Sequence, residues 1–290
     1  MIPAPFDYHR PATLPEAIAL LQQHGDQAKV LSGGQSLLPL LKLRLGAVGH
    51  LVDIGRIPGL EYIKEEGGFL KIGGRTRESE LERSGIIRAR YPILWDTALV
   101  IADPLVRNRA TVGGNLAHAD PANDHPATML ALGAEVTATG AKGARTIPIG
   151  EFFTAFFTTA LTPDEILTEI RVPIPPARSG GAYVKLERKV GDFATAASAV
   201  QLTLAGDGRI ERVGIGLTAA GPTPIEAIAA ETFLLNRQPD AASIAEAARL
   251  AAAATEPTAD RRGAVEYKRE MARVLTRRAL DKAIERAGGR

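Results

Sequence analysis

Apolar positions in the first sixty residues change repeatedly between helical and strand spacing. A helix is predicted to begin after Thr13, because residues 13–16 match a capping box and Leu14, Ala17, Ile18 and Leu21 follow on one face. Short apolar runs at 28–31 and 50–54 predict strands, and Ser36 is expected to cap a helix over 37–44 between them. These elements predict a β–loop–α–β unit whose loop follows the carboxyl end of the first strand.

The middle of the chain alternates short strands with helices. Gly67-Gly68 separates two strand-like runs, and a small apolar helix begins at Pro126. The predicted strands are 60–63, 69–72, 135–139, 146–149 and 166–172, and the predicted helices are 79–90, 92–102 and 126–132.

A segment rich in proline and glycine, 172–181, predicts a domain boundary, which we place between 175 and 176. Beyond it we expect three strands followed by three alanine-rich helices. Asp207-Gly208 is a strong hairpin signal between the second and third of these strands. The expected strands are 182–188, 196–204 and 209–217, and the expected helices are 225–235, 241–254 and 264–286. On the last helix, Tyr267, Met271, Val274 and Leu275 are expected to share the buried face.

Composition narrows the class of protein. A chain of 290 residues with 45% hydrophobic and 23% charged residues predicts a globular protein of about two domains. The net charge of +2 favours no nucleic-acid partner, and no apolar run approaches the ~20 residues of a membrane-spanning helix. No basic segment followed by an apolar core opens the sequence, so we expect a cytoplasmic protein.

The chain contains no cysteine. Disulfides, cysteine-ligated iron–sulfur clusters, thiolate zinc sites and a cysteine nucleophile are therefore excluded. Any electron-transfer chemistry must use an organic cofactor, and any iron–sulfur cluster must belong to another chain.

Two similar glycine motifs are the main candidates for ligand binding. Ser32-Gly33-Gly34-Gln35-Ser36 and Thr111-Val112-Gly113-Gly114-Asn115 each combine a glycine pair with neutral donors. Glycine lets a ligand approach the backbone, and consecutive N–H groups bind anions, more strongly where a helix begins. The hypothesis is that both motifs converge on one phosphate-bearing ligand, while the plainer alternative is a tight turn at each. Lys29, Arg107 and Arg109 could neutralise phosphate or be ordinary surface charges.

The segment His118 to His125 contains two histidines and two aspartates, a composition that raises the question of a metal site. Its spacing is not an established metal-ligand pattern and Pro121 interrupts any helix, so no metal site is predicted. Asp124 could accept hydrogen bonds from ribityl or ribose hydroxyls. The segment could also simply cap the following helix. No catalytic acid, base or nucleophile is predicted.

These motifs, together with Asp-Pro-Ala-Asn-Asp ending at Asp124 and Arg-Lys-Val-Gly-Asp-Phe-Ala at 188–194, resemble the FAD-binding medium subunits of molybdenum hydroxylases, the xanthine dehydrogenase and aerobic carbon monoxide dehydrogenase family. The resemblance runs nearly end to end and is strongest to the carbon monoxide dehydrogenase branch. That branch typically carries tyrosine where this chain has Phe193, and can carry histidine where it has Gln35. Neither difference affects the expected FAD binding.

The resemblance implies an α+β fold. Its FAD-binding domain, residues 1–175, is of the vanillyl-alcohol-oxidase or PCMH type, with lobes at about 1–57 and 58–175. A C-terminal domain, 176–290, is expected to contain a three-stranded antiparallel sheet and helices.

The resemblance also implies a role for each site residue. The diphosphate of FAD would lie on Ser32, Gly33, Gly34, Gln35, Ser36, Thr111, Gly113, Gly114 and Asn115. Lys29 would lie near the adenosine part and Asp124 at the ribityl chain. Ile166 and Leu167 would lie near the ring system, and Phe193 would cover one face of the ring.

The resemblance further implies a complex, a dimer of heterotrimers, with a large molybdopterin subunit and a small subunit carrying [2Fe–2S] clusters. The implied function is electron transfer from those clusters to FAD and on to quinone or NAD, with the complex in the cytoplasm or at the inner face of the membrane. The alternative is a stand-alone flavin oxidase of the vanillyl-alcohol-oxidase type.

Overall fold

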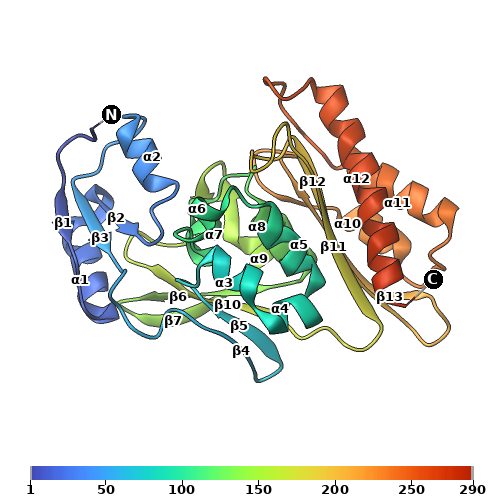
Figure 1. The fold of residues 1–290 in the computed structure, drawn as a ribbon, viewed down its shortest axis with the longest axis horizontal. Helices are drawn as coiled ribbons and strands as arrows, with labels where there is room; N and C mark the ends of the chain where they lie inside the picture. Colours follow the sequence, from blue (N-terminus) through green and yellow to red (C-terminus); the bar gives the residue numbers. More distant parts are fainter. Residues whose placement is uncertain (1, 289–290) are drawn as a thin grey trace.

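The computed structural model describes residues 2–288 as three successive parts arranged side by side (Figure 1). An N-terminal lobe, a middle lobe and a C-terminal part each contain their own β-sheet. The α+β architecture predicted from the sequence is confirmed. None of the helices in the described part of the chain combines the length and apolar character needed to cross a bilayer.

The N-terminal lobe contains a three-stranded parallel sheet in the order β1-β3-β2. Its elements are β1 (Asp7–His9), α1 (Leu14–His24), a short 3-10 turn (Gly25–Gln27), β2 (Ala28–Leu31), α2 (Leu37–Lys42) and β3 (His50–Asp53). As predicted, Thr13 caps α1 by accepting from the N–H of Glu16. The predicted β–loop–α–β unit is confirmed, and its loop leaves the carboxyl end of β2.

The middle lobe contains an antiparallel sheet in the order β4-β5-β10-β6-β7. Its strands are β4 (Ile63–Glu66), β5 (Phe69–Gly73), β6 (Glu135–Gly140), β7 (Gly143–Pro148) and β10 (Ile166–Pro173), with a separate hairpin of β8 (Phe153–Ala155) and β9 (Thr158–Thr159). Its helices are α3 (Glu78–Arg83), α4 (Gly85–Arg90), α5 (Pro92–Val100), α6 (Pro104–Arg107), α7 (Val112–His118), α8 (Asp124–Ala131) and α9 (Ile149–Phe152). The single helix predicted over 79–90 is wrong, because Ser84 has extended backbone angles and caps a new helix by accepting from the N–H of Ile87.

The C-terminal sheet has the order β11-β12-β13-β14 and is antiparallel throughout. Its elements are β11 (Ser179–Leu186), β12 (Ala196–Leu204), β13 (Ile210–Thr218), β14 (Ile225–Glu226), α10 (Ile228–Leu234), α11 (Ala241–Ala253) and α12 (Val265–Arg286). The hairpin at Asp207-Gly208 is confirmed, with Gly208 at φ +84°. The sheet adds β14 to the three strands expected, because residues 225–226 pair with β13 before α10 begins.

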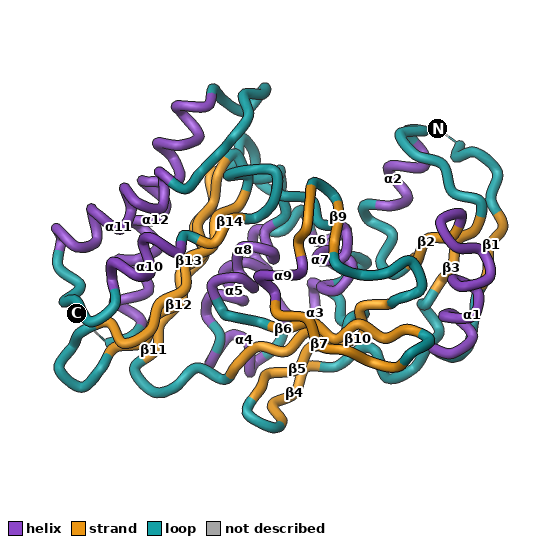
Figure 2. Tube along the Cα trace, turned by 180° about the vertical axis from the view of Figure 1, so that it is seen from behind, coloured by secondary structure: helices purple, strands orange, loops and turns teal. Residues whose placement is uncertain are grey.

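Helices cover both faces of the C-terminal sheet (Figures 1 and 2). Glycines allow this close packing: a Cβ on Gly216 would lie 2.0 Å from the Ala127 carbonyl oxygen of α8. On Gly180 it would lie 2.1 Å from the Ala283 carbonyl oxygen of α12. The cores reflect this arrangement, because Tyr183 and Ala199 of the C-terminal sheet belong to the apolar cluster of the middle lobe. The boundary at 175/176 therefore separates sheets but not hydrophobic cores.

The buried face of α12 differs from the one predicted. Of the four residues expected to share it, Leu275 is buried, whereas Tyr267 is 46% exposed. Small residues make up half of the buried positions of α12, beside larger ones such as Leu280 and Ile284: Ala272, Thr276, Ala279 and Ala283. Thr276 donates to Ser198 of β12. Alanine and threonine add little to a hydrophobic periodicity, so the pattern in the sequence of α12 did not identify its buried face.

Glu231 links α10 to the sheet and makes stability depend on pH. Its carboxylate accepts the N–H of Ile215, a strand residue, at 2.7 Å. Burial raises its pKa to about 7, and the neighbouring Glu226 carboxylate acts in the same direction. A folded-state pKa above the unfolded value means that the folded protein holds the proton longer, so stability should fall as pH rises from about 4.5 to about 7.

Glu231→Gln should remove this pH dependence, because the amide oxygen still accepts from Ile215 but does not ionise. We expect the variant to gain stability above pH 7, by at most about 3 kcal/mol, with little change at pH 5. Urea unfolding at several pH values measures the difference. Glu266→Gln, an exposed acid of α12, is the control and should leave the pH profile unchanged. A profile for Glu231→Gln as steep as that of the wild type would contradict the assignment.

Candidate cofactor-binding site

A cavity of about 630 Å³ lies where the three parts of the molecule meet. This volume is in the range of pockets that enclose small molecules and cofactors. Every site residue predicted from the sequence lines it: Lys29, Ser32, Gly33, Gly34, Gln35, Ser36, Thr111, Gly113, Gly114, Asn115, Asp124, Ile166, Leu167 and Phe193. The fold thus brings together residues more than 160 positions apart, although their individual roles in binding remain a prediction.

The first glycine motif forms a loop between β2 and α2 and presses against the middle lobe. A Cβ on Gly33 would lie 2.3 Å from the Arg109 carbonyl oxygen and 2.8 Å from the Ala110 Cα. Gly34 has φ +76°, a left-handed conformation that favours glycine. Within the described chain, the backbone N–H groups of residues 33–36 donate no hydrogen bond to another residue. This loop therefore presents a row of uncommitted donors.

The second glycine motif is the first turn of helix α7 rather than a loop. Thr111 caps the helix, its hydroxyl accepting from the N–H of Gly114 at 3.2 Å. The N–H groups of Val112 and Gly113 donate to carbonyls of Thr76 and Gly74. The expectation that both motifs offer free consecutive N–H groups is therefore wrong for the second, whose donors hold the helix against the sheet.

A hydroxyl pair joins the two motifs. Ser32 Oγ and Thr111 Oγ1 lie 3.0 Å apart and are part-buried. Because Ser32 belongs to the N-terminal lobe and Thr111 to the middle lobe, this hydrogen bond fixes the two motifs side by side. Ser36 differs from expectation: it occupies the N-cap position of α2, but its side chain makes no capping hydrogen bond. Its hydroxyl remains available at the cavity wall.

The apolar part of the cavity wall comes from β10 and from the connection between β11 and β12. Ile166 and Leu167 open β10, where a bulge after Leu167 disturbs the pairing with β6. Phe193 lies across the cavity with 45% of its surface exposed. Its backbone is held by Asp192, whose carboxylate accepts the N–H of Phe193 at 2.9 Å.

Asp192 fixes the connection between β11 and β12 through ion pairs with other residues of the C-terminal part. Arg262 donates to its carboxylate at 2.9 Å, and Arg188 donates at 3.2 Å. The hydrogen bond from Arg262 and the N–H of Phe193 lower the pKa of Asp192 to about 2, so it is ionised at neutral pH. Gly191, at φ +80°, packs against the backbone of Ala102 and completes the turn.

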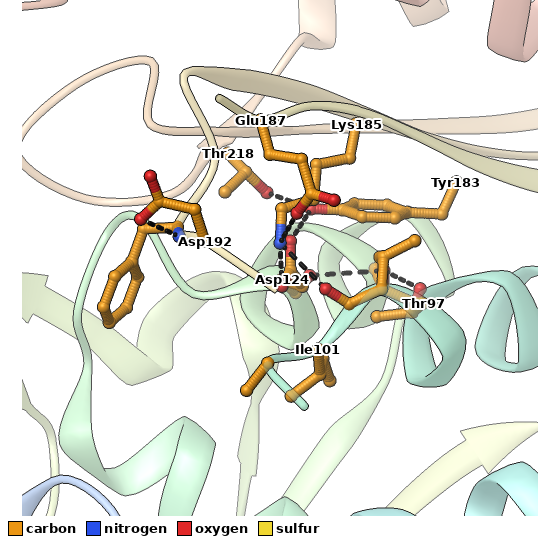
Figure 3. A network of polar contacts seen from close by, with 12 residues as sticks. Thr97, Ile101, Asp124, Tyr183, Lys185, Glu187, Asp192 and Thr218 are labelled. Carbon is orange, nitrogen blue, oxygen red and sulfur yellow. Dashed lines mark hydrogen bonds and ion pairs between the residues drawn. The ribbon is translucent and has the colours of Figure 1, made fainter. Parts of the chain in front are cut away.

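Asp124 lies at the inner end of the cavity, within a buried polar network (Figure 3). Tyr183 donates its hydroxyl to one carboxylate oxygen at 2.6 Å, and Lys185 donates to the other at 2.9 Å. Lys185 also donates to the Val100 carbonyl and pairs with Glu187. Burial raises the pKa of Asp124, while the Lys185 charge opposes the rise. The sequence did not indicate Tyr183 or Lys185, which lie in a strand far from either glycine motif.

Two candidate phosphate ligands lie elsewhere. Arg107 is buried and donates to Glu82 and to the carbonyls of Ile101 and Ala102, so it braces the turn before α6. Arg109 is exposed and outside the cavity lining. Of the basic residues considered, Lys29 lines the cavity.

The residues of the segment 118–125 contact different neighbours and do not form one site. His125 is fully buried and its Nε2 lies 2.7 Å from Glu78 Oε2. His118 lies beside Phe157, with ring centroids 5.0 Å apart, and burial lowers its pKa. Asn123 donates to the Asn115 carbonyl and so ties this segment to α7. The helix starts at Asp124, two residues before the predicted start.

The hairpin β8–β9 is a part of the wall that sequence reasoning missed. Phe157 and the threonines of β9 line the cavity, and Phe157 adopts φ +53° at the turn. A Phe-rich run followed by threonines indicates a strand or a core segment equally well. Its place beside the cavity follows from the fold.

These features define a protein with a large cavity where two α/β lobes and a C-terminal part meet, and comparison with known proteins identifies the family. Residues 4–175 match the family described as FAD binding domain in molybdopterin dehydrogenase, and residues 181–283 match the CO dehydrogenase flavoprotein C-terminal domain. The chain belongs to this family of FAD-binding oxidoreductase subunits.

Individual relatives match it from end to end. It is 45% identical to the carbon monoxide dehydrogenase medium chain of Afipia carboxidovorans, over 99% of both chains. It is 38% identical to the 6-hydroxypseudooxynicotine dehydrogenase complex subunit alpha of Paenarthrobacter nicotinovorans, over 99% of this chain and 97% of the relative. The structure of carbon monoxide dehydrogenase from Hydrogenophaga pseudoflava superposes with a TM-score of 0.96 at 46% identity, covering 99% of both chains.

Proposed function

We propose that this chain is the FAD-binding electron-transfer subunit of a heteromeric molybdenum hydroxylase. It would take electrons from [2Fe–2S] clusters on a small partner subunit and deliver them to an external acceptor, quinone or NAD. A large molybdopterin subunit would oxidise the substrate, in a dimer of heterotrimers located in the cytoplasm or at the inner face of the membrane. The observation that carries the proposal is the single cavity lined by both glycine motifs.

The first glycine loop is the proposed main diphosphate site. Its uncommitted N–H groups at residues 33–36 can donate to phosphate oxygens without breaking any hydrogen bond of the protein. Helix α7 would contribute mainly by position, because Gly113 and Gly114 of its capped first turn line the cavity. Lys29 would add a positive charge on the adenosine side.

The remaining contacts follow the cavity from the glycine motifs to Phe193. Asp124 would face the ribityl hydroxyls, although Tyr183 and Lys185 already occupy both of its oxygens through one hydrogen bond each. A carboxylate oxygen accepts more than one hydrogen bond, so the network orients Asp124 and leaves acceptor capacity for the ligand. Ile166 and Leu167 would contact the ring system and Phe193 would cover one face of it.

The division of labour between subunits is consistent with the chain's composition. FAD supplies the redox chemistry when bound, and the protein positions it and tunes its surroundings. Because the chain has no cysteine, iron–sulfur clusters must be provided by a partner. Large apolar side chains next to cavity-lining residues are strongly exposed, as expected of a surface that a partner covers: Leu105 at 79%, Phe156 at 61% and Val190 at 94%.

Purification of the chain together with its co-expressed partners tests the proposal. We expect a flavin absorption spectrum, and release of about one FAD per copy of this chain on denaturation. Reduction of the bound flavin should require the partners and the substrate, for which carbon monoxide is the first choice because of the sequence likeness. A complex that contains molybdenum and iron but no FAD would contradict the proposal. Oxidation of an organic substrate by the isolated flavin-loaded chain would instead favour the stand-alone oxidase.

A further inference from the structure

Three imidazole rings from three different elements meet on the surface of the N-terminal lobe. His9 ends β1, His24 ends α1 and His50 begins β3. His9 Nε2 lies 3.1 Å from His50 Nδ1, and the rings of His24 and His50 stack with centroids 3.6 Å apart. One ring nitrogen of each histidine lies within 4.8 Å of the others.

These separations are close to those of a metal-ligand set. Nitrogen ligands about 2.0–2.1 Å from a tetrahedral zinc ion are about 3.4 Å from one another, so the His9–His50 spacing already suits one ion, and His24 would have to turn out of its stack on His50 to join them. A fourth ligand is at hand, because Asp7 Oδ2 lies 3.6 Å from His50 Nδ1. All three histidines are partly exposed, so a hydrated ion can reach them.

The backbone already holds this group together. Parallel pairing of β1 with β3 places Asp7 opposite His50, and the Asp7 N–H donates to the Gly49 carbonyl at 2.8 Å. His24 is the last residue of α1, the helix that packs on this sheet through Ala17, Ile18 and Leu21. A metal ion here would find ligands on positioned secondary structure, which lowers the entropic cost of binding.

We propose that His9, His24 and His50, with Asp7 as an oxygen ligand, form a binding site for a divalent transition-metal ion that prefers imidazole, Zn²⁺ in the first instance. Imidazole and carboxylate ligands suit zinc, copper and nickel, and exclude calcium and magnesium as preferred occupants. None of the four residues lines the FAD cavity, so the site is separate from the one proposed above. The ion would cross-link β1, β3 and α1, the framework from which Lys29 and the first glycine loop extend.

Titration of the tag-free full chain, after treatment with a chelator, tests the site. We expect one Zn²⁺ per chain by calorimetry and a rise in melting temperature on adding Zn²⁺. Co²⁺ should give the visible absorption bands of a low-coordinate site. His9→Ala, His24→Ala and His50→Ala should each weaken Zn²⁺ binding more than about tenfold, since even loss of an outer-shell partner costs 10- to 100-fold.

Two further variants keep the result unambiguous. His24→Cys should retain Zn²⁺ binding, because a thiolate replaces the imidazole as a ligand. Gln23→Ala, an exposed neighbour on α1, should bind as the wild type does. Unchanged Zn²⁺ binding in the triple histidine variant would overturn the proposal, as would failure of the folded wild type to bind Zn²⁺ at about 1 mM, which corresponds to only about 4 kcal/mol of binding free energy.

Discussion

Gly33→Ala is expected to weaken FAD binding at least about tenfold and to destabilise the contact between the two lobes. The added methyl group would lie 2.3 Å from the Arg109 carbonyl oxygen and 2.8 Å from the Ala110 Cα. Both are backbone atoms in the turn that leads into Thr111, so they cannot rotate away as a side chain would. Forcing one methyl group into such a packed contact typically costs 1–3 kcal/mol, and about 1.4 kcal/mol corresponds to a tenfold change in affinity.

Relief of that clash must move the first loop away from α7. The Ser32–Thr111 hydrogen bond would lengthen, and the free N–H groups of residues 33–36 would leave the position in which the fold holds them. The loss therefore does not depend on any new charge near the diphosphate. Fluorescence titration of the deflavinated complex with FAD, and the flavin-to-protein ratio after desalting, measure the effect.

Gly85→Ala is the matched control, because a Cβ at Gly85 meets no atom within 4 Å and the residue lies in the first turn of α4. It should keep the wild-type FAD content and be as stable as the wild type or slightly more so. Wild-type FAD affinity in Gly33→Ala would show that the two lobes need not be in close contact for binding.

Asp124→Ala is expected to lower the free energy of unfolding by up to about 3–5 kcal/mol, the usual cost of breaking a buried ion pair, because Lys185 then keeps only Glu187, at 3.4 Å, as a charged partner. The Lys185 side chain is only 2% exposed, so its ammonium group cannot turn to water when the carboxylate is removed. Tyr183, also buried, would lose the shorter of its two hydroxyl hydrogen bonds on the same substitution and keep only the contact with Thr218. The network joins α8 to β11, so the damage should extend across the interface between the middle lobe and the C-terminal sheet.

Urea unfolding measures this cost, and a surface ion pair provides the control. Glu246 and Arg249 of α11 are in contact at 2.6 Å but exposed, so Glu246→Ala should lower the free energy of unfolding far less than Asp124→Ala does. Lys185→Met in the Asp124→Ala background should recover part of the loss, because it removes the stranded charge. A loss in Asp124→Ala no larger than in Glu246→Ala would contradict the buried ion pair.

Flavin titration then distinguishes the role of Asp124 in the buried network from its proposed contact with the ribityl chain. Asp124→Asn keeps the shape of the side chain and an acceptor oxygen but removes the charge. If Asp124 serves only the network, the folded fraction of this variant should bind FAD as the wild type does. Weaker FAD binding by protein that remains folded would support the ribityl contact.

Much of the local structure follows from short stretches of sequence. The cap at Thr13 and the hairpin at Asp207-Gly208 depend on residues within a few positions of each other, so their geometry is encoded where it occurs. The break at Ser84 is also local, yet it was missed because the apolar pattern continues across it. The buried face of α12 depends on β11 and β12, which lie far along the chain and which periodicity does not report.

By itself, the sequence determined the two glycine motifs and the absence of cysteine, so that any cysteine-ligated iron–sulfur cluster must belong to a partner. It could not determine which of the motifs keeps free N–H donors, because that depends on the carbonyls of Gly74 and Thr76, in the segment that follows β5, reaching the start of α7. Nor could it place Tyr183 and Lys185 on Asp124, or bring three histidines from β1, α1 and β3 into one group. These residues lie far apart in the sequence and come within a few ångströms only when whole helices and strands pack together. Because the interactions between them act over short distances, the order of residues along the chain does not reveal them.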